Sequence, residues 1–74
     1  MIDNTQRQIL YAVYLYTKEP KTINELAKMM HIDKKTFKEL VDDLATKQLV
    51  RLIRENALIA TSTKKGTYIY PIIQ

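Results

Sequence analysis

Lysine and threonine side chains that can contact a nucleic acid gather in one short segment of the sequence. Lys34, Lys35 and Lys38 lie within a stretch of five residues, and Thr36 stands between them. A lysine ammonium can bind phosphate oxygens or guanine O6 and N7, whereas threonine can contact a phosphate or the thymine methyl group. Side chains of these types at this spacing could contact the backbone and base edges of DNA. The further candidate contacts are Lys21, Thr22, Lys64, Lys65 and Thr67.

Carboxylates in the same segment oppose this interpretation. Glu39 and Asp42 share the lysines' face on a helical wheel, and Asp43 follows them. Carboxylates repel phosphate, although one glutamate can accept a hydrogen bond from cytosine N4. Lys38 and Asp42 are spaced i, i+4, so we expect them to pair along a helix. The alternatives are a DNA-binding face of modest affinity and an ordinary solvated face.

Catalytic and metal-binding chemistry is not predicted. His31 is the only histidine and cysteine is absent, so the sequence offers neither a serine–histidine–aspartate set nor a thiolate metal site. Asp42 and Asp43 diverge by about 100° on a helix, which suits a metal ion poorly. The single glycine, Gly66, excludes a glycine-rich nucleotide loop. We expect no enzyme activity, no metal and no cofactor.

The first two helices are predicted from their caps and their apolar periodicity. Residues 4–18 form the first helix: an N-cap is available within residues 3–5, and Pro20 cannot continue the helical ladder. Residues 23–30 form the second helix. Its start, Thr22-Ile23-Asn24-Glu25, matches the capping box, with threonine at the N-cap and glutamate at N3.

A third helix, over residues 34–47, carries the lysines. Asp33 is its predicted N-cap. Apolar residues recur along it at i, i+3, i+4 and i+7, which is an amphipathic pattern: Phe37, Leu40, Val41 and Leu44. The lysines lie opposite that stripe or on its flanks.

The C-terminal third of the chain has the composition of β-strands. Residues 57–61 and 67–72 are rich in β-branched and aromatic side chains, and the turn over residues 62–66 ends at Gly66, where a hairpin needs positive φ. Residues 49–55 fit either a helix stripe or a strand that begins directly after the third helix, and the strand is the preferred interpretation. The element order is therefore helix, helix, tight turn, helix and hairpin.

This order resembles the winged helix-turn-helix family of DNA-binding domains over residues 6–72. The segments that carry the resemblance are Leu26-Ala27, Ile32-Asp33, Thr36-Phe37, Leu40-Val41, Leu44 and Gln48-Leu49-Val50. Family members usually have glycine where Gln48 stands. The stretch Lys64-Lys65-Gly66, followed by residues 67–71, also looks like the wing of small regulators encoded by phages and plasmids.

The resemblance implies an α+β fold, a winged helix with a three-helix helix-turn-helix core and a C-terminal β-hairpin wing. It also implies that the first half of the third helix enters the major groove. Lys21, Thr22 and the start of the second helix would contact a phosphate, and Lys64 and Lys65 would grip the backbone or the minor groove. The function so implied is double-stranded DNA binding by a small transcriptional regulator.

The first helix has more apolar surface than one core can cover. Residues 9–16 are all apolar or aromatic, so the middle of the helix has no polar face. One stripe faces the core, and Tyr11, Tyr14 and Leu15 remain for a second contact. One interpretation is a homodimer seam built from this helix. The other is that the tyrosines lie against the wing sheet with their hydroxyls in water.

Length and charge agree with a small binding domain. The chain has 74 residues, which predicts one domain over residues 1–74, and its 12 basic and 8 acidic residues give a net charge of +4. Residues 9–16, the longest apolar run, are too short to cross a bilayer, so we expect a cytoplasmic protein with no membrane partner. The expected partners are double-stranded DNA and a second copy. The alternative is a winged-helix protein–protein module, such as a phage-type inhibitor of a host protein.

Overall fold

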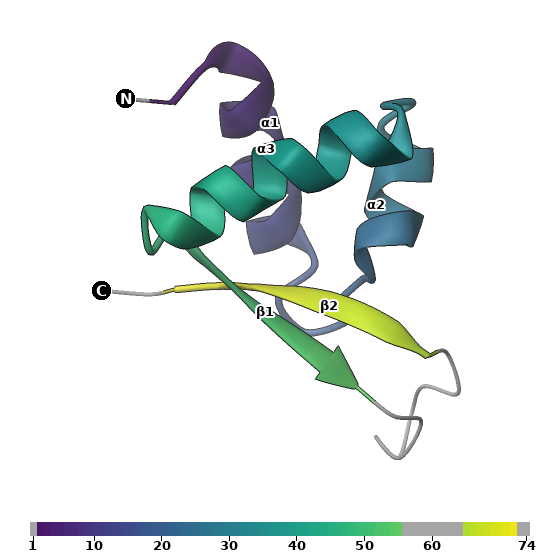
Figure 1. The fold of residues 1–74 in the computed structure, drawn as a ribbon. Coiled ribbons are helices and arrows are strands. Elements are labelled where there is room, and N and C mark those ends of the chain that lie inside the picture. The colour runs from purple at the N-terminus through teal and green to yellow at the C-terminus, as the bar shows by residue number, and fades with distance from the viewer. Residues whose placement is uncertain (1, 56–64, 73–74) are drawn as a thin grey trace.

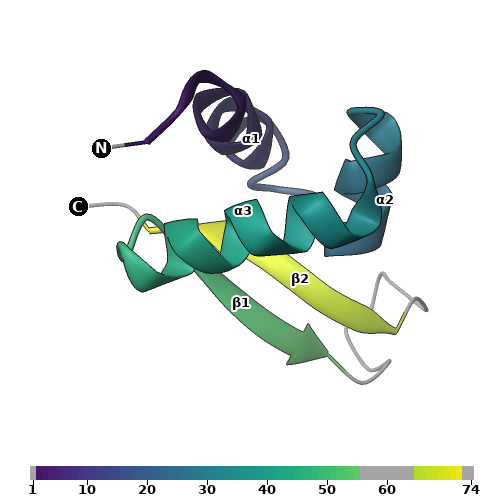
Figure 2. The same ribbon diagram turned by 45° about the horizontal axis from the view of Figure 1, so that its top comes forward.

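The computed structural model describes residues 2–55 and 65–72, which contain three helices and a two-stranded antiparallel sheet. The elements are α1 (Asn4–Leu15), α2 (Ile23–Met29), α3 (Lys34–Thr46), β1 (Val50–Glu55) and β2 (Gly66–Pro71). In Figures 1 and 2 the helices lie together on one side of the hairpin, and α3 runs across it. The α+β class and the predicted element order are confirmed. None of these helices has the length and apolar character that crossing a membrane requires.

The core forms where α3 meets the other helices and the sheet. Phe37, Val41 and Leu44 of α3 have no exposed surface, as the i, i+4 and i+7 spacing predicts. They pack in one cluster with buried residues of α1 and α2 and with Val50 and Ile69 of the two strands. Because α3 contributes to the centre of this cluster, core packing fixes its orientation relative to the sheet.

Each helix begins with a side chain that accepts a hydrogen bond from a backbone amide. Thr22 and Glu25 form the predicted capping box, with the Glu25 amide 3.1 Å from the Thr22 hydroxyl. Asp33 caps α3 as predicted and accepts from the Thr36 amide at 3.2 Å. For α1 the cap is Asp3, one of the three candidate positions, and it also forms a capping box.

Both α2 and α3 end in a Schellman motif without glycine. His31 and Gln48 have φ of 57° and 61°, the left-handed conformation that glycine usually supplies. The Gln48 amide donates to Ala45 and the Leu49 amide donates to Leu44, both at 3.0 Å. These hydrogen bonds satisfy the last carbonyls of α3 and turn the chain directly into β1. The strand preferred for residues 49–55 is therefore confirmed, and the helical alternative is wrong.

The predicted end of α1 is wrong by three residues. The helix stops at Leu15, and Tyr16 is its C-cap, with φ of −103° and ψ of 28°. The hydroxyl of Thr17 donates to the Tyr14 carbonyl at 2.8 Å, so a side chain satisfies an acceptor that a longer helix would have paired with an amide. This local competition ends α1 before Pro20 can.

The hairpin pairs β1 with β2 in a register that runs from Val50 opposite Pro71 to Glu55 opposite Gly66. The strand predicted over residues 57–61 and most of the turn predicted over residues 62–66 lie outside the described residues. Gly66 does have the expected positive φ, 152°, but it is already the first residue of β2.

Candidate nucleic-acid interface

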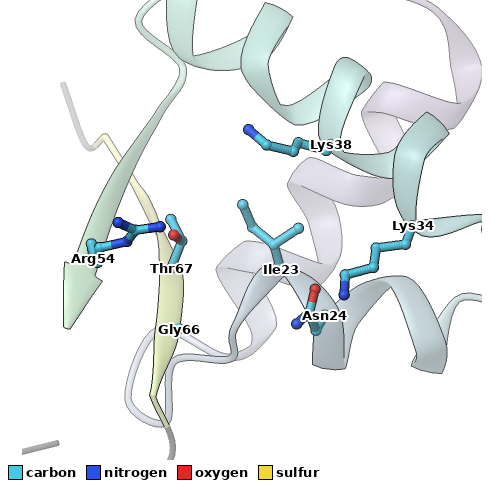
Figure 3. Close-up of a pocket in the computed structure, with 7 residues that line it drawn as sticks. All are labelled: Ile23, Asn24, Lys34, Lys38, Arg54, Gly66 and Thr67. Carbon is cyan, nitrogen blue, oxygen red and sulfur yellow. The ribbon is translucent and has the colours of Figure 1, made fainter. Parts of the chain in front are cut away.

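A basic hollow lies where α2, α3 and the hairpin meet. Its volume is about 250 Å³. The lining residues come from four elements and are Ile23, Asn24, Lys34, Lys38, Arg54, Gly66 and Thr67. Figure 3 shows Lys38 directed from α3 towards the hairpin, Lys34 directed towards Asn24, and the guanidinium of Arg54 beside Thr67. Three cations therefore surround one hollow, and none of its lining residues within the described part of the chain is acidic.

Helical and strand periodicity bring these cations together. Lys34 and Lys38 are spaced i, i+4 and so lie on the same side of α3. On β1, Arg54 shares a face with Val50 and Leu52, because side chains alternate along a strand. Val50 is buried and Leu52 packs against the core. Arg54 thus extends the core-facing side of the strand beyond the point where the core ends.

The cations around the hollow can pair with an anion at little cost. Lys38 makes an ion pair with Asp42 at 3.3 Å, as its i, i+4 spacing predicts, and both side chains are more than half exposed. An exposed pair of this kind contributes only about 0–1 kcal/mol, so the lysine can exchange partners at little cost. Lys34 and Arg54 make no ion pair with another residue of the part of the chain that the structure describes.

The remaining predicted contacts of α3 are not part of the hollow. Lys35 and Thr36 are exposed and do not line it. The Thr36 hydroxyl lies 3.4 Å from the carboxylate of Asp33, so it takes part in the N-cap of α3. The basic residues predicted on this helix therefore divide into two sets, Lys34 and Lys38 around the hollow and Lys35 on the outer surface.

Lys21 and Thr22, the predicted phosphate contacts at the start of α2, both have partners within the chain. The Lys21 ammonium is 3.6 Å from Glu19 and 5.2 Å from the centre of the Tyr16 ring. Thr22 is only 4% exposed, and its hydroxyl is part of the capping box. Thr22 also forms an isolated bridge with Tyr68, which attaches the start of α2 to β2.

Part of the predicted wing can be placed. Lys65 is exposed and Thr67 is half-buried on the wall of the hollow, whereas Lys64 lies outside the described residues. Between them, Gly66 allows a close approach: a Cβ at this position would lie 3.2 Å from Cγ2 of Thr22. The close contact and the positive φ of 152° both favour glycine at this contact between β2 and the start of α2.

Arg54 and Asn24 are lining residues that sequence reasoning missed. Asn24 is the second residue of the capping-box helix, and only the structure brings it to the hollow. Arg54 carried a usable signal, since Val50, Leu52 and Arg54 alternate as a strand face that ends in a cation. That signal depends on reading residues 49–55 as a strand.

The residues predicted for a dimer seam are exposed on α1. Tyr11, Tyr14 and Leu15 are 68%, 50% and 64% exposed, and their i, i+3 and i+4 spacing places them on one face. Tyr14 also contacts the residue that follows β2, because its hydroxyl donates to the Ile72 carbonyl at 3.5 Å. None of these three residues lines the basic hollow.

Comparison with known proteins adds no family to this description. The chain matches no family model, no curated protein and no solved structure.

Proposed function

We propose that the chain is a winged-helix DNA-binding domain that acts as a small transcriptional regulator. The observation that carries this proposal is the basic start of α3, where Lys34, Lys35 and Lys38 are all exposed on the first turns of the helix. An exposed helix of this length can enter the major groove, which admits an α-helix. The opposite side of α3 is anchored by Phe37, Val41 and Leu44, so the helix would be presented rigidly.

In this proposal the hairpin acts as the wing beside α3. Lys65 and Arg54 add positive charge at the end of the hairpin nearest the start of α3. Contacts of this type neutralise phosphates and supply affinity that does not depend on sequence, whereas α3 supplies the base contacts. The carboxylates of Glu39 and Asp42 on α3 reduce the affinity of one domain. A homodimer formed through α1 would compensate by presenting two recognition helices.

Binding of duplex DNA as a function of salt tests this proposal. Log affinity should fall linearly with log salt, because each phosphate contact contributes about 0.9 to the slope. The variant Lys35→Ala with Lys38→Ala should bind more weakly and flatten the slope by up to about 2. Arg7→Ala with Lys18→Ala is the matched control: it removes the same charge from exposed positions that are not part of α3 or of the hollow. Equal losses in both variants, or no duplex binding at low salt, would contradict the proposal.

A second candidate function is a protein–protein module, which could inhibit or redirect a partner protein. The observation that favours it is the mixed charge of α3, where Asp42 already pairs with Lys38, together with the exposed Tyr11 and Leu15. Exposed apolar patches mark interaction sites in soluble proteins. Purification after nuclease treatment separates the two functions. If the chain is a protein–protein module, a protein partner should co-purify in a stoichiometric amount, and duplex DNA of arbitrary sequence should show no salt-sensitive binding.

A further inference from the structure

The basic hollow is a candidate binding site, called the seat below, for a single phosphate group. Pockets for drug-sized molecules have volumes of about 300–1,000 Å³, and the hollow, at about 250 Å³, is smaller. Apolar atoms make up most of the lining surface, but Ile23 is the one described lining residue with an apolar side chain. The polar groups of the lining include Asn24, Thr67 and three cations. We expect a compact oxyanion here because three cations surround the hollow and none of its described lining residues is acidic. Asp42, which pairs with Lys38, is the described carboxylate that an anion would displace.

We propose that Lys34, Lys38 and Arg54 together hold one phosphodiester group of the DNA backbone, between α3 and the hairpin. This inference rests on the proposed function and assigns the hollow within it. Arg54 would give the site its geometric preference for phosphate, since a guanidinium can form two parallel hydrogen bonds to one phosphate. Lys34 and Lys38 approach from α3, and the Thr67 hydroxyl lies on the β2 wall. A phosphate bound here would be in contact with both α3 and the hairpin, so both would bind the same DNA strand.

The two arginines of β1 provide a matched pair for testing whether the hollow binds a phosphate. Arg51 and Arg54 are both exposed, but they lie on opposite faces of the strand, opposite Tyr70 and Thr67 respectively. Arg54→Ala should lower duplex affinity by at least about 10-fold and flatten the salt slope by about 0.9. Arg54→Lys keeps the charge but loses the paired geometry, so it should weaken binding while leaving the slope unchanged. Arg51→Ala should do neither.

Coupling between variants identifies residues that share one phosphate. Lys34→Ala and Arg54→Ala should be non-additive, because removing either residue already weakens the same contact. Lys35→Ala and Arg54→Ala should be additive, since Lys35 does not line the hollow. Equal effects of Arg51→Ala and Arg54→Ala, or additivity of the Lys34 and Arg54 variants, would overturn the seat even if duplex binding is strong. A thermal melt of each variant shows whether it remains folded.

Titration with inorganic phosphate at low salt separates failure of the seat from failure of the proposed function. The seat predicts amide shifts in the NMR spectrum that are confined to residues around the hollow, such as Lys34, Lys38 and Thr67, and that are lost in Arg54→Ala. Such shifts without any duplex binding would refute DNA as the source of the phosphate and would retain the anion site. Shifts that are absent, or that persist in Arg54→Ala, would overturn the site itself.

Discussion

Replacing Gln48 with glycine tests how α3 ends and β1 begins. Gln48 has φ of 61°, and a side chain in the left-handed region costs roughly 1–2 kcal/mol. Glycine removes this cost, but its greater freedom in the unfolded chain offsets about 0.5–1 kcal/mol. The two hydrogen bonds of the Schellman motif come from backbone amides and are unaffected. We therefore expect Gln48→Gly to raise the free energy of unfolding by about 0.5–1 kcal/mol.

Thermal unfolding monitored by circular dichroism can measure this gain. In a domain of this size 1 kcal/mol corresponds to about 4–8 °C, so Tm should rise by roughly 2–8 °C. Gln8→Gly is the matched control, since Gln8 is an exposed glutamine inside α1 and its φ is not positive. That variant should lose about 0.5–1 kcal/mol. A Tm for Gln48→Gly equal to or below that of the unmodified protein would refute the reasoning.

Two further predictions concern α1 and its junction with α3. If α1 forms a homodimer seam, Leu15→Glu should give folded monomers that bind duplex much more weakly, and sedimentation of the unmodified protein as a monomer at high concentration would rule the seam out. Hydrogen bonds from Lys47 and then from Gln6 lower the pKa of Asp43 below its ordinary 3.8. Because the folded-state pKa is the lower one, this stabilisation is complete above about pH 4 and is lost as pH falls through the folded pKa. Asp43→Asn should therefore lose less stability than the unmodified protein between about pH 5 and pH 2 in urea titrations, and equal losses would contradict the assignment.

Local sequence signals predicted the starts of the helices because a cap involves residues close in the chain. Thr22 with Glu25, and Asp33 with the amide of Thr36, are contacts between residues three apart. The end of α3 was harder to predict, because the usual glycine is replaced by Gln48. The backbone adopts the left-handed conformation regardless, since Leu49 and Val50 must join the core on the other side of the turn.

The site was less predictable than the fold because it depends on contacts between distant residues. The sequence indicated Lys34 and Lys38 from their place on an amphipathic helix, but it could not bring Arg54 to them. That juxtaposition requires the register that places Arg54 opposite Thr67. Burial of Thr22 likewise follows from its bridge to Tyr68, 46 positions further along the chain, and not from its own neighbourhood.

The hollow begins at the point on the core-facing side of β1 where the side chains change from apolar to charged. Along β1 the same face passes from Val50, which is 2% exposed, through half-buried Leu52 to exposed Arg54. A slip of one residue in the pairing would move Arg54 to the opposite face and turn Ile53 towards the helices. Burial of Val50 and Leu52 opposes that slip, because it would take their side chains out of the core. The same hydrophobic packing that holds the hairpin against α3 therefore sets the position of Arg54 relative to Lys34 and Lys38.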